Sequence, residues 1–286
     1  MRIPIIAALL LSGCVAAAGN ALPRGGPAAP ELQADRPHGS HVTIVLMENK
    51  DYDLVVGSSQ APYLNKVLIP QGALLENSHA VAHPSEPNYL ALFSGSTQGV
   101  TGDPCPVTFD ATNIASELIA AGKTFAGYSE SLPRDGYTGC YSGRYARKHS
   151  PWVDFTNVPP SDNLVYDGFP KKHAASFVWI TPNLCHDTHD CVVKVGDKWL
   201  AKNLPPIVAW DKTHDGLLIL TWDEADPDAN GKNQIATVLV GPMVKAGITS
   251  TQKIDHYGVL RTIEKILKVP CIANDCKAKA IKGIWQ

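Results

Sequence analysis

Short apolar runs alternate with amphipathic segments along most of this chain. Residues 41–48 (HVTIVLME) and 216–225 (GLLILTWDEA) are nearly continuous apolar stretches. Such runs are typical of strands that are buried on both faces of a parallel sheet. Residues 255–269 (DHYGVLRTIEKILKV) place apolar side chains three and four positions apart, which predicts an amphipathic helix. We therefore predict an α/β fold, a three-layer α/β/α sandwich built around a mainly parallel sheet.

The same alternation predicts the other elements. Residues 112–122 should form a helix that Thr112 caps and Gly122 ends. Residues 131–175 show no regular periodicity, and because long loops in compact domains are commonly functional, we expect this segment to face the substrate. The remaining predicted elements are a helix at 87–95 and strands at 73–82, 124–130, 175–183 and 235–244.

The N-terminal segment has the composition of an export signal. Residues 1–14 (MRIPIIAALLLSGC) contain an apolar run too short to cross a bilayer, and its end resembles the bacterial lipoprotein signal, the lipobox. We expect cleavage before Cys14 and lipidation of this cysteine; the alternative is ordinary secretory cleavage further on, with Cys14 lost. Residues 15–40 are rich in Pro, Gly and Ala and would tether one domain at 41–286 to the membrane. Export to the periplasm or cell envelope is predicted in both cases.

The net charge limits how the protein can attract a charged substrate. The formal net charge of −2 gives no general attraction for nucleic acid, so an anionic substrate must be held by local groups.

Removing Cys14 leaves six cysteines, which indicate disulfides in an exported protein, with about 15 pairings open. A zinc-thiolate site is less favoured because no Cys-x-x-Cys pair occurs. Short loops favour Cys185–Cys191 and Cys271–Cys276, which leaves Cys105 to pair with Cys140.

Acidic side chains follow two of the predicted buried strands. Glu48 and Asn49 follow the first strand, and Asp223 and Glu224 follow the strand that begins at residue 216. A carboxylate at such a position is costly unless a cation or hydrogen bonds compensate its charge. The two pairs predict a shared site for a divalent cation, since oxygen ligands suit hard or borderline metals. The alternative is that each pair caps a helix or pairs with Lys or Arg.

Ser85 is the candidate nucleophile. It lies in AVAHPSEPNYLALFSGS (residues 80–96), after a predicted strand and before Pro87, a residue that is common in the first turn of a helix. In the structural alternative, Ser85 only caps this helix. We expect Asn88 to face the same pocket, where helix N–H groups favour an anion such as phosphate. A metal on the Ser85 hydroxyl would lower its pKa and make it a nucleophile at neutral pH.

Histidines supply candidate proton donors and ligands. His189 follows a strand in TPNLCHDTHDC, and His256 opens the last helix, so we predict functional roles for both. His83 and His149, together with Asp187, are candidates for substrate binding. The remaining candidates are interpreted as surface histidines without a role in the reaction: His38, His41, His173 and His214.

Several motifs taken together resemble one known family. IVLMENKDY, HPSEPNYLALFSGSTQG, ITPNLCHDTHDC, LTWDEAD and DHYGVLRTIEKIL occur in this order over residues 41–269. The set is similar to the bacterial and fungal phosphoesterase family of acid phosphatases and phospholipase C-type enzymes, within the alkaline phosphatase superfamily. This resemblance implies an alkaline phosphatase-like fold and the hydrolysis of phosphoric esters.

The resemblance also implies residue roles. Ser85 would attack phosphorus and form a phosphoserine intermediate, and Asn88 would donate to a phosphate oxygen. His189 or His256 would protonate the leaving oxygen. The implied metal ligands are Glu48, Asn49, Ser85, Asp223 and Glu224, around Zn, Mg or Ca.

An exported acid phosphatase acting on monoesters is the favoured function, because the chain has no evident additional lipid-binding domain. The alternative activity is that of a phospholipase C-type phosphodiesterase. An envelope lipoprotein that only binds phosphorylated ligands is a second alternative, which predicts the loss of a polar site position that this chain retains. A Ser-His-Asp carboxylic esterase is less favoured, since the chain lacks the G-x-S-x-G motif and the acidic strand ends stay unexplained.

Overall fold

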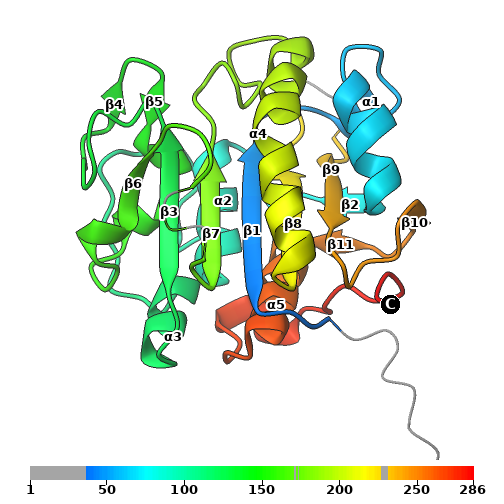
Figure 1. Ribbon diagram of the computed structural model, residues 1–286. Helices are drawn as coiled ribbons and strands as arrows, with labels where there is room; N and C mark the ends of the chain where they lie inside the picture. Colours follow the sequence, from blue (N-terminus) through cyan, green and yellow to red (C-terminus); the bar gives the residue numbers. More distant parts are fainter. Residues whose placement is uncertain (1–36, 171, 173, 227–230) are drawn as a thin grey trace, which may run out of the picture. The chain divides into compact units, whose positions relative to one another are not determined.

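The computed structural model describes residues 37–170, 172, 174–226 and 231–286 (Figure 1). The predicted signal peptide, Cys14 and nearly all of the predicted tether therefore lie outside the described residues. The central sheet has nine strands in the order β10-β2-β9-β8-β1-β7-β3-β6, with β11 paired to β2. β9 runs antiparallel to β2 and β8, and the other pairs in this sheet are parallel. The predicted α/β fold with a mainly parallel sheet is confirmed.

The elements have the following bounds. The strands are β1 (His41–Met47), β2 (Ala73–His79), β3 (Phe125–Glu130), β4 (Tyr141–Ser142), β5 (Tyr145–Ala146), β6 (Asn163–Tyr166), β7 (Phe177–Thr181), β8 (Gly216–Trp222), β9 (Gln234–Val240), β10 (Ile248–Ser250) and β11 (Ile254–Asp255). The helices are α1 (Tyr52–Val55), α2 (Ser85–Ser94), α3 (Ile114–Ala120), α4 (Val193–Thr213) and α5 (His256–Leu267).

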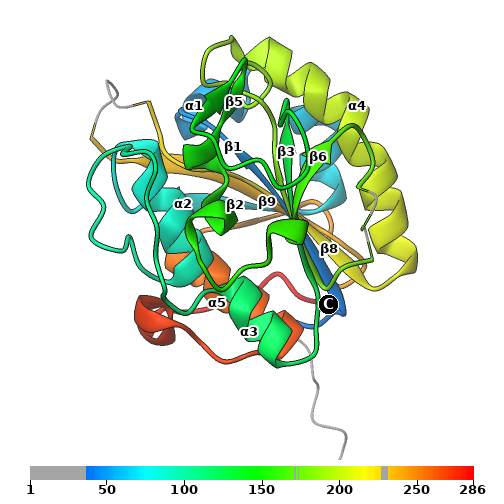
Figure 2. The ribbon, with the colours of Figure 1, turned by 90° about the vertical axis from the view of Figure 1, so that its left-hand side faces the viewer.

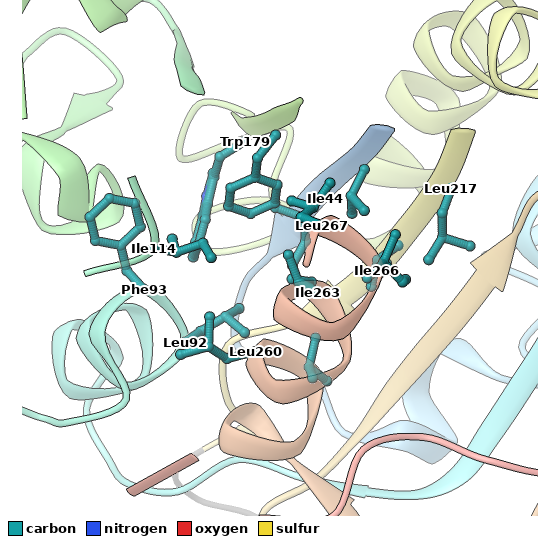
Figure 3. Packing of buried hydrophobic residues seen from close by; sticks show 14 of the residues in the cluster. Ile44, Leu92, Phe93, Ile114, Trp179, Leu217, Leu260, Ile263, Ile266 and Leu267 are labelled. Atoms are coloured by element: carbon teal, nitrogen blue, oxygen red, sulfur yellow. The ribbon is translucent and has the colours of Figure 1, made fainter. Parts of the chain in front are cut away.

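β1 shows how the sheet joins two hydrophobic cores. Val42, Ile44 and Leu46 pack on one face with side chains of α2, α3 and α5, whereas Val45 and Met47 pack on the other face with side chains of α4. Because successive strand residues point to opposite faces, a strand between two helical layers needs apolar side chains on both faces, as β1 has from Ile44 to Met47. Figure 2 shows the two groups of helices on opposite sides of the sheet, and Figure 3 shows the packing of α5 against the first face.

The longest helix was not expected from the sequence. α4 has 21 residues and contains Pro205 and Pro206, which remove two backbone N–H groups and normally end a helix. Both prolines are exposed, as are Ala201 and Lys202, whose carbonyls lose their helical donors. Those carbonyls can bond to water, while the opposite side of α4 is buried in the second core.

Residues 131–175 are more ordered than their composition predicts. They contain the β4–β5 hairpin, the edge strand β6, and the 3₁₀ turns Arg147–His149, Pro151–Asp154 and Pro160–Asp162. β6 extends the main sheet by pairing with β3. The expectation of one long irregular loop was wrong, because short strands of mixed composition carry too little periodicity to be recognised.

Three disulfides join the segments that the cysteine spacing suggested. Cys185–Cys191 closes the loop between β7 and α4, and Cys271–Cys276 closes a turn after α5. Cys105–Cys140 ties the segment after α2 to the region of the β4–β5 hairpin. Within the described ranges, no helix combines the length and apolar character needed to cross a bilayer.

The start of α3 corrects one sequence-based expectation. The capping residue is Asn113 rather than Thr112: its side chain accepts a hydrogen bond from the Ser116 backbone N–H, and the Ser116 hydroxyl lies 3.0 Å from the Asn113 backbone nitrogen. Gly122 follows the helix with φ of +70°, as its predicted role as a stop requires.

This difference gives a direct test of the helix start. Asn113→Ala should lower the free energy of unfolding by about 1–2 kcal/mol, because it removes the capping bond at a fully buried position. Thr112→Ala, the matched control one residue earlier, should have little effect. Urea unfolding followed by circular dichroism measures both. Equal losses for the two variants would contradict the assignment.

Candidate active site

The centre of the site is built by two adjacent parallel strands. In the register of β1 and β8, Met47 lies beside Trp222, so the next residues, Glu48 and Asp223, emerge side by side. Both carboxylates are fully buried. The Asn49 backbone N–H donates to Asp223 Oδ1 at 3.0 Å. The structure therefore brings the two predicted acidic strand ends together at the carboxyl edge of the sheet.

Two further residues join this cluster from other segments. Asp187, in the loop between β7 and α4, accepts at its backbone carbonyl from the Glu48 N–H at 2.7 Å. His149 Nε2 lies 3.0 Å from Glu48 Oε1, and its Nδ1 lies 3.5 Å from Asp187 Oδ2. One ligand atom from each of these three residues lies within 4.8 Å of the other two. We expected His149 and Asp187 to bind substrate, but they lie inside the carboxylate cluster.

Burial and mutual repulsion dominate the electrostatics of the cluster. Burial, with the charge of Glu224, raises the pKa of Asp223 to about 7. Burial also raises the pKa of Glu224 to about 7 and raises the pKa of Glu48 and Asp187 well above their usual values. In the part of the chain that the structure describes, these carboxylates contact His83 and His149, and no Lys or Arg lies within ion-pair distance of them. The alternative of a direct pair with Lys or Arg is therefore not realised there.

The donor set fits a divalent cation. Burial lowers the pKa of His149 well below its usual value, so its imidazole is neutral and can offer a lone pair. A set of carboxylate and amide oxygens with one imidazole suits a hard or borderline divalent metal. Four buried polar atoms in the cluster have no hydrogen-bond partner: Asn49 Oδ1, Asp187 Oδ2, Asp223 Oδ2 and His149 Nε2.

Ser85 is the first residue of α2 and does not cap it. The cap position is Pro84, and no side chain makes the capping hydrogen bond. The Ser85 hydroxyl instead lies 3.1 Å from Glu48 Oε2 and 3.2 Å from Glu224 Oε1. One turn further on, the Tyr89 hydroxyl donates to Glu48 Oε1, which locks the helix to the cluster. The structural alternative for Ser85 is therefore wrong.

The helix terminus differs from what the sequence predicted. Asn88 is fully buried, and its amide oxygen accepts from the N–H groups of Val81 and Ala82. Its amide nitrogen donates to the carbonyls of Ala82 and Pro84. Both donors and both acceptor positions are thereby used, so Asn88 shapes the turn before Ser85 and has no hydrogen left for a phosphate.

A carboxylate already occupies the start of α2. The Glu86 backbone N–H donates to Asp103 Oδ1 at 3.0 Å, and Pro87 has no N–H. The Lys148 ammonium donates to Asp103 Oδ2 at 2.7 Å. Its positive charge lowers the pKa of Glu48, Asp187 and Glu224, so Lys148 is a cation close to the cluster.

The histidines divide into buried and accessible groups. His256 is buried, its Nε2 lies 2.6 Å from the Asp223 carbonyl, and burial lowers its pKa. His83 contacts Glu224 through Nδ1 with 38% of its side chain exposed. His189 is 28% exposed at the side chain, with its ring centroid 5.8 Å from that of His149. His83 and His189 are therefore accessible from solvent.

Another histidine departs from expectation. His41, interpreted as a surface residue, is buried in β1 with Nε2 2.9 Å from the Thr43 hydroxyl. His38 and His214 lie at or near the surface, as expected. His173 lies outside the described residues.

Sequence reasoning missed three site residues. Tyr89 lies four positions after Ser85, so helical spacing alone places it on the same face. Thr188 donates its hydroxyl to the Glu48 carbonyl at 2.6 Å. Neither Thr188 nor Asp103, the partner of Lys148, had a sequence signal, because both depend on contacts between distant segments.

Solved structures with a similar fold include a protein of the alkaline phosphatase superfamily. A protein of that superfamily from Vibrio parahaemolyticus aligns with a TM-score of 0.59 over 86% of this chain and 71% of its own, at 14% identity. A phosphonate monoester hydrolase from Silicibacter pomeroyi aligns with a TM-score of 0.56 over 85% and 76%, at 11% identity. At such identities, these similarities show the fold alone.

Sequence comparison shows the family. The model of the phosphoesterase family matches residues 58–270, and the chain belongs to this family. It is similar to a phosphatidylinositol-3-phosphatase of Mycobacterium tuberculosis, with 41% identity over 99% of this chain and 92% of the relative. It is 30% identical to a probable acid phosphatase of Kluyveromyces lactis over 79% of this chain, which spans 58% of that relative's length. The protein is a phosphoric ester hydrolase.

The raised pKa values predict how a metal should affect stability. The folded-state pKa values of Asp223 and Glu224, about 7, exceed their ordinary values of 3.8 and 4.5. Without metal, their contribution to stability should be full below about pH 4 and should be lost as the pH rises through 7. A saturating divalent cation should raise Tm at about pH 8 by about 5–10 °C, and by less at about pH 5.

Differential scanning calorimetry with EDTA or with added Mg²⁺, Zn²⁺ or Ca²⁺ measures this effect. Asp223→Asn should abolish most of the metal-dependent shift. Asp211→Asn is the matched control, because Asp211 is also buried with its pKa raised to about 7, but lies at the opposite end of the sheet near His41. Identical Tm values with EDTA and with every cation would contradict the metal site.

Proposed function

We propose that this protein is an exported, metal-dependent acid phosphatase that hydrolyses phosphomonoesters through Ser85. The observation that carries the proposal is the position of the Ser85 hydroxyl, between Glu48 Oε2 and Glu224 Oε1 at the carboxyl edge of the sheet. A serine that only stabilised its helix would bond to the helix backbone instead.

The residues that would hold the metal are Glu48, Asn49, Asp223 and Glu224 with the Ser85 hydroxyl. His149 and Asp187 lie close enough to Glu48 to complete the set or to hold a second ion. When bound, the cation supplies charge that stabilises the phosphoryl oxygens and lowers the pKa of the attacking hydroxyl. Two findings support this assignment: the family membership, and the buried oxygen and nitrogen atoms of the cluster that have no hydrogen-bond partner.

The chain's own groups then handle the protons. Ser85 Oγ forms a bond to phosphorus as the ester P–O bond breaks, and its proton passes to Glu224, whose Oε1 lies 3.2 Å from Ser85 Oγ. The leaving oxygen takes a proton from His83 or His189, two accessible histidines near the cluster. Water then attacks phosphoserine and gives its proton to that histidine, while the P–Oγ bond breaks, phosphate is released and the proton on Glu224 returns to Ser85 Oγ.

The relatives support a phosphomonoester as substrate. The names of the Mycobacterium tuberculosis and Kluyveromyces lactis proteins both describe phosphatases. We propose that the substrates of this chain include phosphorylated polyol headgroups of the phosphoinositide type. A phospholipase C-type diesterase activity is the outcome that would replace this proposal.

Export is supported by two features. Residues 1–14 resemble a lipoprotein signal, which would anchor the protein through Cys14. The three disulfides fit an oxidising compartment such as the periplasm or the cell envelope.

Replacement of the nucleophile tests the mechanism. Ser85→Ala should lower kcat for p-nitrophenyl phosphate by about 10⁴-fold or more, because no other hydroxyl takes its place. Mass spectrometry of the acid-quenched enzyme should detect phosphoserine at residue 85 only in the parent protein. Ser94→Ala is the matched control: Ser94 is buried in the same helix, but its hydroxyl donates to the Leu90 carbonyl. Full turnover by Ser85→Ala would refute the mechanism.

The choice of ester is tested with the same chromophore. The protein should hydrolyse p-nitrophenyl phosphate faster than p-nitrophenyl phosphorylcholine from acidic to neutral pH, and EDTA should abolish this activity. Metal added after chelation should restore it. A preference for the diester would favour the phospholipase C-type alternative, and EDTA-resistant hydrolysis of p-nitrophenyl acetate would favour a carboxylic esterase.

A further inference from the structure

A cavity of about 450 Å³ opens between α4 and the ends of β3 and β6. None of the proposed metal ligands or proton donors lines it. His186 lines the cavity, and the next residue, Asp187, lies in the carboxylate cluster, so the cavity and the cluster flank one loop. The proposed function assigns no role to this cavity.

α4 presents one continuous face to the cavity. The lining positions on this helix are three and four residues apart, which places them on a single side. Two of them, Lys198 and Lys202, are exposed lysines, and within the described ranges neither ammonium group has an ion-pair or hydrogen-bond partner. The full set on α4 is Val195, Lys198, Trp199, Lys202 and Asn203.

Two carboxylates, Glu130 and Asp167, match the two lysines in number. Glu130 is paired, because its Oε2 lies 2.8 Å from His186 Nδ1 and accepts from the Asn183 N–H at 3.0 Å. Asp167 is the other carboxylate. Because Glu130 is held by His186 and Asn183, the exposed ammonium groups of Lys198 and Lys202 stay available to an anionic group of a ligand.

The base of the cavity is fixed and partly aromatic. The Tyr166 hydroxyl donates to Asn203 Oδ1 at 3.1 Å, and the Tyr166 and Trp199 ring centroids lie 5.6 Å apart. Both rings are largely buried, so the wall is preformed. An apolar ring edge below two cations suits a polyol ring that carries a charged substituent.

The sheet order sets the distance from the reaction centre. The cluster lies at the end of β1. Counting outward from β1, the next strands of the sheet are β7, β3 and β6, in this order. Neighbouring strands are about 4.8 Å apart, so the cavity lies about 10–14 Å from the cluster along the sheet edge. A substrate must therefore carry its second recognition group on the far side of a ring or chain.

We propose that this cavity binds a second anionic group of the substrate, a phosphate or phosphodiester on a polyol, while the reacting phosphomonoester lies at Ser85. The inference rests on the proposed function and assigns Lys198 and Lys202 as specificity-determining residues. They contact the leaving group, so they govern KM for doubly anionic substrates and leave the chemical step unchanged.

The test compares inositol monophosphate, a soluble inositol bisphosphate and p-nitrophenyl phosphate. In the parent protein, KM for the bisphosphate should be about fivefold to tenfold lower than for the monophosphate, as expected for two solvent-exposed ion pairs. The double variant Lys198→Gln/Lys202→Gln should lose this difference, with kcat and the p-nitrophenyl phosphate kinetics unchanged. Lys194→Gln, on the same helix but outside the cavity, should retain it.

Binding measurements separate this inference from the proposed function. Calorimetric titration of Ser85→Ala with the inositol bisphosphate should show affinity that falls with added NaCl and falls again when both lysines are replaced. Equal affinity with and without the two lysines would overturn the inference, even if Ser85-dependent turnover is observed. Absence of p-nitrophenyl phosphate turnover in the parent protein would overturn the proposed function, and the titration would still decide the cavity.

Discussion

Mutual repulsion between buried carboxylates is the constraint on which this molecule depends. Glu48, Asp187, Asp223 and Glu224 meet at one edge of the sheet, almost entirely shielded from water. Two apolar strands in parallel register force Glu48 and Asp223 together. Burying several negative charges at one point is unfavourable unless a cation or protons compensate them. The same desolvated charge that costs stability would be compensated by the divalent cation that we propose for this site.

Much of the surrounding structure holds this cluster in place. Tyr89 links α2 to Glu48 and stacks on His149 with ring centroids 5.0 Å apart. Arg147, the neighbour of Lys148, donates to Asp154 at 2.9 Å and to the carbonyls of Thr138 and Val107. The Cys105–Cys140 disulfide joins the same two segments. The region expected to be an irregular loop is therefore a fixed wall that places Lys148 and His149.

The sequence predicted the fold where local pattern and tertiary packing agree. β1, β8 and α5 are recognisable because burial on both faces, or on one helical face, leaves a clear apolar period. α4 was missed because Pro205 and Pro206 oppose the helix locally, and only its packing against the second core overrides them. β6 was missed because a four-residue edge strand carries little periodic signal.

In the candidate site, too, local pattern reveals some residues and only tertiary packing brings the others together. Glu48 and Asp223 could be located because both follow buried strands whose carboxyl ends meet. The predicted contact of Asn88 with phosphate was wrong, because the Asn88 amide makes all of its hydrogen bonds to the backbone of the turn before Ser85. No local sequence pattern shows these bonds. His149 and Asp187 required knowledge of which distant loops converge on Glu48. Residue type and strand position therefore predict the chemistry, whereas the complete ligand set depends on the tertiary structure.

The central claim is that the buried carboxylates form a metal site beside Ser85. The most direct test is anomalous diffraction from crystals soaked in Mn²⁺ or Zn²⁺, recorded at the absorption edge of the metal. The account predicts a strong anomalous peak enclosed by Glu48, Asp223 and the Ser85 hydroxyl. Well-ordered density for these side chains with no anomalous peak among them, in crystals whose protein retains phosphatase activity after chelation, would contradict it.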